Sequence, residues 1–146
     1  MNPDHLDLDE FLPYQINVLA ARLSRGLAEI YQQRFGIAIP EWRVMAHLAR
    51  ATAISVKDVH ARVDMDKPKI TRAAQRLEQA GLVSKKVHDQ DRRLVTLALT
   101  AKGRALYAKI EPLALAYERK ALASLPPELE AALRDAVRLL NKSQDD

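Results

Sequence analysis

The chain has 146 residues, a formal net charge of +4 and no cysteine. The lack of cysteine excludes disulfide bonds, a thiolate nucleophile, a cysteine redox switch and cysteine zinc sites. Hydrophobic residues make up 48% of the chain and charged residues 29%, the balance of a globular protein that folds without disulfides or metals.

Two features of the sequence bear on location. Its apolar runs are shorter than the roughly 18 residues that a membrane-spanning helix needs, so we expect no membrane partner. The first ten residues, MNPDHLDLDE, are acidic, unlike a secretory signal or a transit peptide. We therefore expect a cytoplasmic protein.

Basic residues are concentrated in one segment of the chain. Residues 67–93 contain eight lysines and arginines and three acidic residues, a net charge of +5, so the remaining residues sum to −1. Such a segment is typical of a phosphate-binding face, and also of an ordinary solvated basic surface. Charge by itself leaves both interpretations open.

Periodicity predicts two helices in the first third of the chain. Apolar residues recur every three or four positions over residues 11–35 (Leu12, Ile16, Leu19, Leu23, Leu27, Ile30), which indicates a long helix. Gly36 suits a left-handed helix end. Pro40 is expected to open a second helix that runs to about Arg50 and buries Trp42, Met45, Leu48 and Ala49.

Two more helices are predicted before Gly81. Ser55 suits the N-cap of a short helix that ends near Arg62, and Asp66 suits the N-cap of the next one, with Pro68 in its first turn. The apolar stripe of that fourth helix is Ile70, Ala73, Ala74 and Leu77.

After Gly81 the pattern changes to two short β-rich runs, residues 82–87 and 94–100, joined by a charged tip. This predicts a β-hairpin. Thr100 is then expected to cap a long helix through Leu122 that Pro112 kinks or loosens. Pro126 and Pro127 open a last helix, which shows one apolar face (Leu129, Leu133, Val137, Leu140).

The order helix, tight turn, helix and hairpin is that of a winged helix-turn-helix. In the fourth helix Lys69, Arg72 and Arg76 share a face opposite the apolar stripe. A helix of this kind can pack on a core and present cations to the major groove, which admits one helix. The alternative to a DNA-binding helix is an ordinary amphipathic surface helix, but the basic hairpin that follows favours nucleic-acid binding.

The hairpin and its flanks resemble a known family. The run Asp91–Gly103, DRRLVTLALTAKG, resembles the wing signature of the multiple-antibiotic-resistance regulator (MarR) family. Residues 70–83 are similar to its recognition helix and wing entry, and residues 39–44 to its second helix. The resemblance implies a bacterial transcription regulator that binds palindromic DNA as a homodimer and is released by a small, often aromatic and anionic, effector.

The expected fold is therefore mainly α with a small β-wing, a winged helix-turn-helix domain flanked by dimerisation helices. The long apolar stripes of the first and last helices lack an obvious partner in one small domain, which supports dimerisation. The expected parts are an acidic N-terminal arm (1–10), a dimerisation helix (11–36), the winged domain (37–100), C-terminal dimerisation helices (101–141) and a polar tail (142–146).

Ten residues are predicted to contact DNA: Ser55, Lys67, Lys69, Thr71, Arg72, Arg76, Lys85, Lys86, Arg92 and Arg93. Those of the fourth helix are candidates for base edges or phosphates, and Lys85, Lys86 and Arg92 for phosphates regardless of sequence. Ser55 either donates to a phosphate or simply caps its helix. The resemblance implies that Arg93 enters the minor groove and that Asp91 orients it.

A second set of residues is a candidate effector site: Tyr14, Val18, Arg22, Arg43 and His47. Arg43 and His47 are one turn apart on the second helix and can hold a carboxylate, with the other three as the opposing wall. The alternative is an exposed basic stripe.

No catalytic motif, cofactor motif or metal site is predicted, because no carboxylate pair lies on a predicted buried face and the sequence has no glycine-rich phosphate loop, G-x-S-x-G elbow, HxxxH pair or HExxH pair. We expect a repressor rather than an enzyme. Two other classes stay open: a DNA-binding protein without an effector, and a helical adaptor whose basic face meets an acidic protein.

Overall fold

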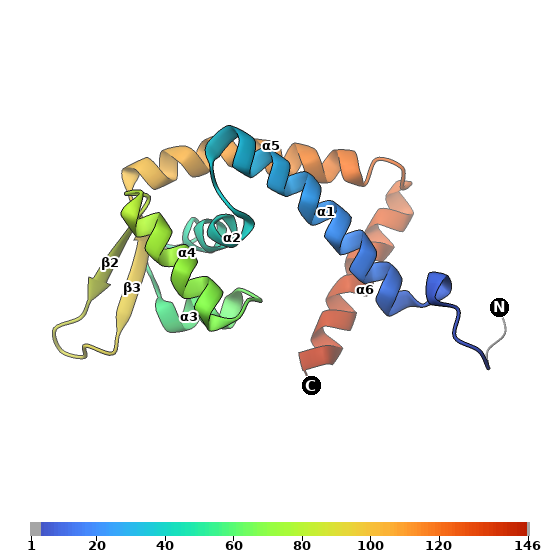
Figure 1. The fold of residues 1–146 in the computed structure, drawn as a ribbon, viewed down its shortest axis with the longest axis horizontal. Helices are drawn as coiled ribbons and strands as arrows, with labels where there is room; N and C mark the ends of the chain where they lie inside the picture. Colours follow the sequence, from blue (N-terminus) through green and yellow to red (C-terminus); the bar gives the residue numbers. More distant parts are fainter. Residues whose placement is uncertain (1–3, 146) are drawn as a thin grey trace. The chain divides into compact units, whose positions relative to one another are not determined.

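The computed structural model describes residues 4–145 (Figure 1). Its elements in chain order are η1 (Leu8–Glu10), α1 (Leu12–Phe35), α2 (Ile39–Leu48), β1 (Ile54–Ser55), α3 (Val56–Arg62), α4 (Lys67–Gln79), β2 (Val83–Val87), β3 (Val95–Leu99), α5 (Ala101–Ala121) and α6 (Pro127–Asp145). This mainly helical fold with a small antiparallel sheet confirms the predicted winged helix-turn-helix class. Within residues 4–145, each helix is too short or too polar to cross a bilayer.

The chain divides into two compact units, the first ending at Leu113 and the second beginning at Ala114. The first unit thus contains the winged domain together with α1 and the first half of α5. This boundary lies inside α5, between Leu113 and Ala114. The reason is that Gly103 and Ile110 of α5 are buried.

Helix ends fall where the local chemistry predicts them. Gly36, after α1, has a φ of 65°, and Gly81, after α4, has a φ of 75°, the left-handed region that glycine tolerates best. The Oγ of Ser55 accepts the Asp58 N–H at 3.0 Å, and Asp66 Oδ1 accepts the Lys69 N–H at 2.9 Å. These bonds satisfy backbone donors that helix starts leave unpaired.

The sheet contains one strand more than the predicted hairpin. Its order is β1-β3-β2, all antiparallel, with Val83 opposite Leu99 and Val87 opposite Val95. The added strand β1 has two residues and pairs Ile54 with Leu97. Two residues are too few to show a strand period in the sequence.

Helix α2 differs from its prediction in its limits and in its buried side. It begins at Ile39 and ends at Leu48, and it buries Val44 in addition to Met45 and Leu48. Trp42 and Ala49, predicted to be buried, are half-buried. Trp42 lies instead between two rings, 5.0 Å from Tyr31 and stacked 5.1 Å from Tyr107.

This aromatic stack joins α1, α2 and α5 within the first unit. Burial and a hydrogen bond to Glu111, together with the charge of that carboxylate, raise the pKa of Tyr107 to about 12, although Arg50 acts in the opposite direction. Tyr107 therefore stays a neutral ring over Trp42 at ordinary pH.

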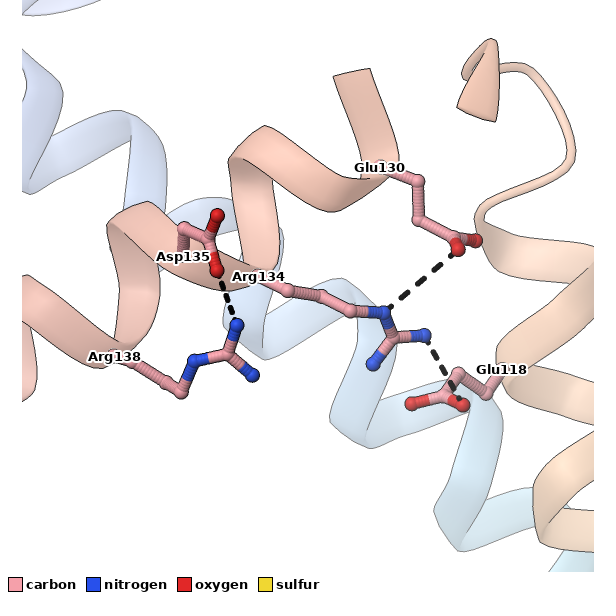
Figure 2. A network of polar contacts seen from close by, with 5 residues as sticks. All are labelled: Glu118, Glu130, Arg134, Asp135 and Arg138. Carbon is pink, nitrogen blue, oxygen red and sulfur yellow. Dashed lines mark hydrogen bonds and ion pairs between the residues drawn. The ribbon is translucent and has the colours of Figure 1, made fainter. Parts of the chain in front are cut away.

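The second unit is the end of α5 and α6, which Figure 2 shows from close by. Arg134 of α6 bridges Glu118 of α5 at 3.4 Å and Glu130 of its own helix at 3.8 Å, and Arg138 pairs with Asp135. Helix α6 continues to Asp145, so residues 142–145 are helical rather than a separate tail. This segment contains no glycine or proline to stop the helix.

Candidate nucleic-acid interface

A groove of about 640 Å³ brings together residues that are far apart in the sequence. It lies between α3, the start of α4 and the β2–β3 hairpin, and its lining is Ser55, Val56, Lys57, His60, Lys67, Lys85, Asp91, Arg93, Leu94 and Val95. Four cations from four segments face one carboxylate. Such a hollow suits a chain of phosphates, because each phosphate carries a negative charge that lysine and arginine neutralise.

Helix α4 lines this groove with its first residue, Lys67, and leaves its polar side exposed. Ile70, Ala73 and Leu77 are buried, as predicted, while Ala74 is half-buried. The remaining predicted contacts near the helix start are exposed: Lys67, Lys69, Thr71 and Arg72. The burial pattern therefore fixes the helix on the core and leaves these polar side chains in solvent.

Arg76 is placed differently from the other α4 cations. Its guanidinium Nη1 lies 3.7 Å from Glu41 Oε1 of α2. Arg76 follows Ala73 by three residues and precedes Leu77, both buried, so it stands at the edge of the surface that packs on α2. Its side chain is engaged within the protein itself.

The hairpin tip holds Arg93 in a defined local geometry. Asp91 Oδ1 accepts hydrogen bonds from the Arg93 backbone N–H at 3.0 Å and from its Nε at 3.3 Å. The Arg93 side chain is nevertheless 94% exposed. This arrangement fits the predicted orienting role of Asp91, because the carboxylate holds the backbone N–H and the guanidinium Nε of Arg93 while the side chain stays exposed.

The other predicted contacts are divided between the two sides of the wing. Lys85 lines the groove. Lys86, the next residue on β2, points to the opposite side of the strand, because successive side chains alternate. Arg92 is exposed in the turn. Ser55 lines the groove while its Oγ already caps α3.

Two residues of this groove, and Glu41 of α2 outside it, were not predicted from the sequence. Lys57 and His60 of α3 line the groove, and the His60 Nδ1 is buried without a hydrogen-bond partner among the described atoms. Their spacing of three on one short helix was the available signal. Glu41 gave no signal beyond its place three residues after the N-cap residue Ala38.

The candidate effector residues are only partly brought together. Tyr14, Val18 and Arg22 line a shallow hollow of about 300 Å³ on α1, with Asp9, Gln15 and Leu19. Arg43 and His47 do not belong to this hollow. Burial lowers the pKa of His47, and the charges of Arg62 and Arg50 lower it further, so His47 is neutral at pH 7.

Across residues 4–145, no group of three or more histidine or acidic side chains is arranged to hold a metal ion.

The sequence is similar to known regulators. Residues 35–94 match the profile described as the MarR family. The chain is 26% identical over 113 residues to the HTH-type transcriptional regulator BilQ of Clostridium symbiosum, covering 77% of this chain and 78% of that protein. It is 27% identical over 118 residues to the homoprotocatechuate degradative operon repressor of Escherichia coli, covering 78% and 80%.

Solved structures share the fold over nearly the whole chain. A MarR/EmrR family transcriptional regulator from Acinetobacter sp. ADP1 is 27% identical, with a TM-score of 0.86, and the match covers 96% of this chain and 99% of that one. Sco3205 of Streptomyces coelicolor, solved in complex with DNA, has a TM-score of 0.85 at 21% identity, covering 97% and 91%. BpsR of Bordetella bronchiseptica, whose DNA binding is regulated by 6-hydroxynicotinic acid, has a TM-score of 0.84 at 22% identity, covering 97% and 99%.

Proposed function

Because the chain belongs to the MarR family of helix-turn-helix transcriptional regulators, we propose that it binds a palindromic DNA operator as a homodimer and that a small effector releases it. Regulators of this family are non-enzymatic DNA-binding proteins. The observation that carries the proposal is the groove in which Lys57, Lys67, Lys85 and Arg93 converge beside the exposed side of α4.

In the proposed complex, α4 enters the major groove and the hairpin reaches the adjacent minor groove. Lys67, Lys69, Thr71 and Arg72 contact bases or phosphates from α4. Arg93 enters the minor groove, where a narrow A·T tract attracts arginine. The phosphate contacts come from Ser55, Lys85, Lys86 and Arg92, together with Lys57.

The homodimer is supported by apolar side chains that the single chain leaves in solvent. On α1 these are Leu12, Tyr14, Ile16 and Leu19, and on α6 they are Leu129, Leu133, Val137, Leu139 and Leu140. Helix α6 has no buried residue among those described, and a helix of this kind gains most of its stability from packing its apolar face on another surface. A two-fold dimer would present two copies of α4 to a palindromic site.

The effector is proposed to be a small aromatic or carboxylate-bearing molecule. The hollow on α1 combines the ring of Tyr14, the apolar Val18 and the cation Arg22, a set that suits a flat anion. Arg43 and His47 lie outside this hollow. We propose that they bind the effector from α2, with Arg43 supplying a charge for a carboxylate and His47, neutral at pH 7, donating an uncharged N–H. The BpsR structure, whose ligand is an aromatic acid, supports this class of molecule.

We further propose that the regulator represses transcription, as the relative from Escherichia coli is named to do, and that it acts on DNA in the cytoplasm. Repression requires that the bound protein block the promoter, and release by the effector then restores transcription.

The test is a binding titration with DNA selected by the protein itself. The purified protein is used to enrich duplexes from a random-sequence pool, and its affinity for an enriched duplex is measured across a salt series. We expect a palindromic consensus and a steep linear fall of log affinity with log salt, because several phosphates displace counterions. Failure to enrich any duplex at low salt, or a flat salt plot, would refute the proposal.

A further inference from the structure

Among residues 4–145, Glu41 is the one charged residue that is buried. Its side chain is 10% exposed. The two carboxylate oxygens have different partners: Oε2 accepts the Ala38 N–H at 3.0 Å, and Oε1 lies 3.7 Å from the Arg76 guanidinium. One carboxylate therefore joins the first turn of α2 to the second half of α4.

A carboxylate in this position requires its partners, because burying a charge without compensation is costly. The Ala38 N–H and the N-terminal end of α2 offset part of that cost. The remainder is met by Arg76, on the helix that packs directly against α2. A shift of α4 along α2 would change the distance between the two charges.

Arg76 differs in this respect from the other cations of α4. Across the described part of the chain, Lys67, Lys69 and Arg72 form no ion pair with an acidic residue, whereas Arg76 does. Arg72 is exposed one turn earlier on the same helix. The two arginines therefore make a matched pair, one engaged with the protein and one free for an outside partner.

We infer that Glu41 is a positioning residue for DNA recognition and that Arg76 is its anchor on α4 rather than a contact to DNA. The inference rests on the proposed function. The pair sets how α4 sits on α2, and therefore how Arg72 and Thr71 meet the bases. Arg76 accordingly contributes to sequence discrimination without neutralising a phosphate.

The experiment compares Glu41→Gln, Arg76→Gln, the double variant and Arg72→Gln. Glutamine at position 41 can still accept the Ala38 N–H, so Glu41→Gln removes the charge and keeps the helix cap. The probes are a duplex enriched from a random pool by the wild-type protein and a random-sequence duplex of equal length. Circular dichroism sets a temperature at which every variant is folded.

We expect Glu41→Gln and Arg76→Gln each to weaken binding to the enriched duplex by about three- to tenfold, because residues in contact are coupled and either change breaks the same pair. Binding to the random duplex and the slope of log affinity against log salt should stay at the wild-type values. The double variant should be no weaker than the weaker single variant. Arg72→Gln should reduce the salt slope by about one for each subunit if Arg72 contacts a phosphate, or relax the selected sequence if it contacts a base.

Two results would overturn the inference. If Arg76→Gln reduces the slope of log affinity against log salt, Arg76 contacts a phosphate. If Glu41→Gln folds and binds the enriched duplex with wild-type affinity, the Glu41–Arg76 pair only stabilises the fold. If Glu41→Gln does not fold, the Arg76→Gln variant tests the inference by itself, because the Arg76 side chain is 61% exposed. Arg76→Lys should then bind the enriched duplex more tightly than Arg76→Gln does. Failure of the wild-type protein to enrich any duplex would refute the proposed function instead.

Discussion

Arg93 illustrates how one acidic neighbour sets the direction of a flexible side chain. Asp91 accepts both the backbone N–H and the Nε of Arg93. An arginine in solvent samples many rotamers, and holding its backbone N–H and its Nε reduces the entropy that binding would otherwise remove. The exposed end of the side chain is thus preorganised for an anionic partner.

Arg93→Ala should weaken binding to an enriched duplex by about tenfold or more, since one well-placed contact contributes about 1–3 kcal/mol. The melting temperature should not change, because the side chain is 94% exposed. A gel-shift titration at fixed salt measures the first quantity and circular dichroism the second. Arg92→Ala, the neighbour without the Asp91 contacts, is the control and should lose less affinity. An unchanged affinity of Arg93→Ala would remove Arg93 from the interface.

His47 gives the protein a predictable loss of stability in acid. Its pKa is lowered from the ordinary value of 6.5 by burial first, and then by Arg62 and Arg50. The unfolded chain therefore binds a proton at a higher pH than the folded protein does. The stability linked to His47 is fully present above pH 6.5 and decreases as the pH falls from there to the lower pKa of the folded state.

His47→Gln should remove this part of the pH dependence. Urea unfolding of both proteins between about pH 5 and pH 8 measures it as the change in unfolding free energy with pH. The variant should show the flatter curve on the acid side. Parallel curves for the two proteins would mean that His47 titrates alike in the folded and unfolded states.

At the scale of elements, the start of α5 shows why the sequence has a glycine at position 103. Thr100 Oγ1 accepts the Gly103 N–H at 3.0 Å and donates to the Gly81 carbonyl at 2.6 Å. A Cβ on residue 103 would lie 2.0 Å from the Leu82 carbonyl oxygen. That oxygen is held in place, because it accepts the Thr100 N–H at 3.0 Å.

Gly103→Ala should therefore destabilise the fold by about 1–3 kcal/mol or more, because backbone atoms must move to admit the methyl group. Chemical denaturation measures the change in unfolding free energy. Lys109→Ala, on the exposed side of the same helix, is the control and should stay near the wild-type value. Equal stability of Gly103→Ala and wild type would mean that α5 can move away from Leu82 freely.

At the scale of the whole molecule, apolar side chains on α1 and α6 are left in solvent by a single chain. Exposed apolar surface of this extent marks an interaction site. Val137→Glu, at a position that is 48% exposed, should therefore dissociate the proposed dimer and leave the helices folded. Light scattering after size exclusion measures the mass, and weaker binding to the enriched duplex should accompany the loss of the dimer.

Lys142→Glu, also on α6 and exposed, changes charge at a polar position and is the control. It should keep the mass of a dimer. A Val137→Glu variant that also keeps this mass would show that this position of α6 lies outside the interface.

The sequence by itself determined the elements that local chemistry specifies. Asp66 and Ser55 cap helices because their side-chain oxygens accept hydrogen bonds from nearby N–H groups. Gly36 and Gly81 end helices because glycine tolerates the left-handed region best. The cationic side of α4 followed in the same way from a period of 3.6 residues. These features depend on neighbours within a few positions.

Only the tertiary structure decided what distant residues do to one another. Lys57 and Arg93 meet in one groove, Trp42 lies between two tyrosines rather than in the core, and Arg76 turns to Glu41 rather than joining its neighbours in solvent. Lys57 and Arg93, Glu41 and Arg76, and Trp42 and Tyr107 lie 35 or more positions apart. Residues so far apart carry no periodic signal of their contact, because the packing of whole helices and strands, not local spacing, brings them together.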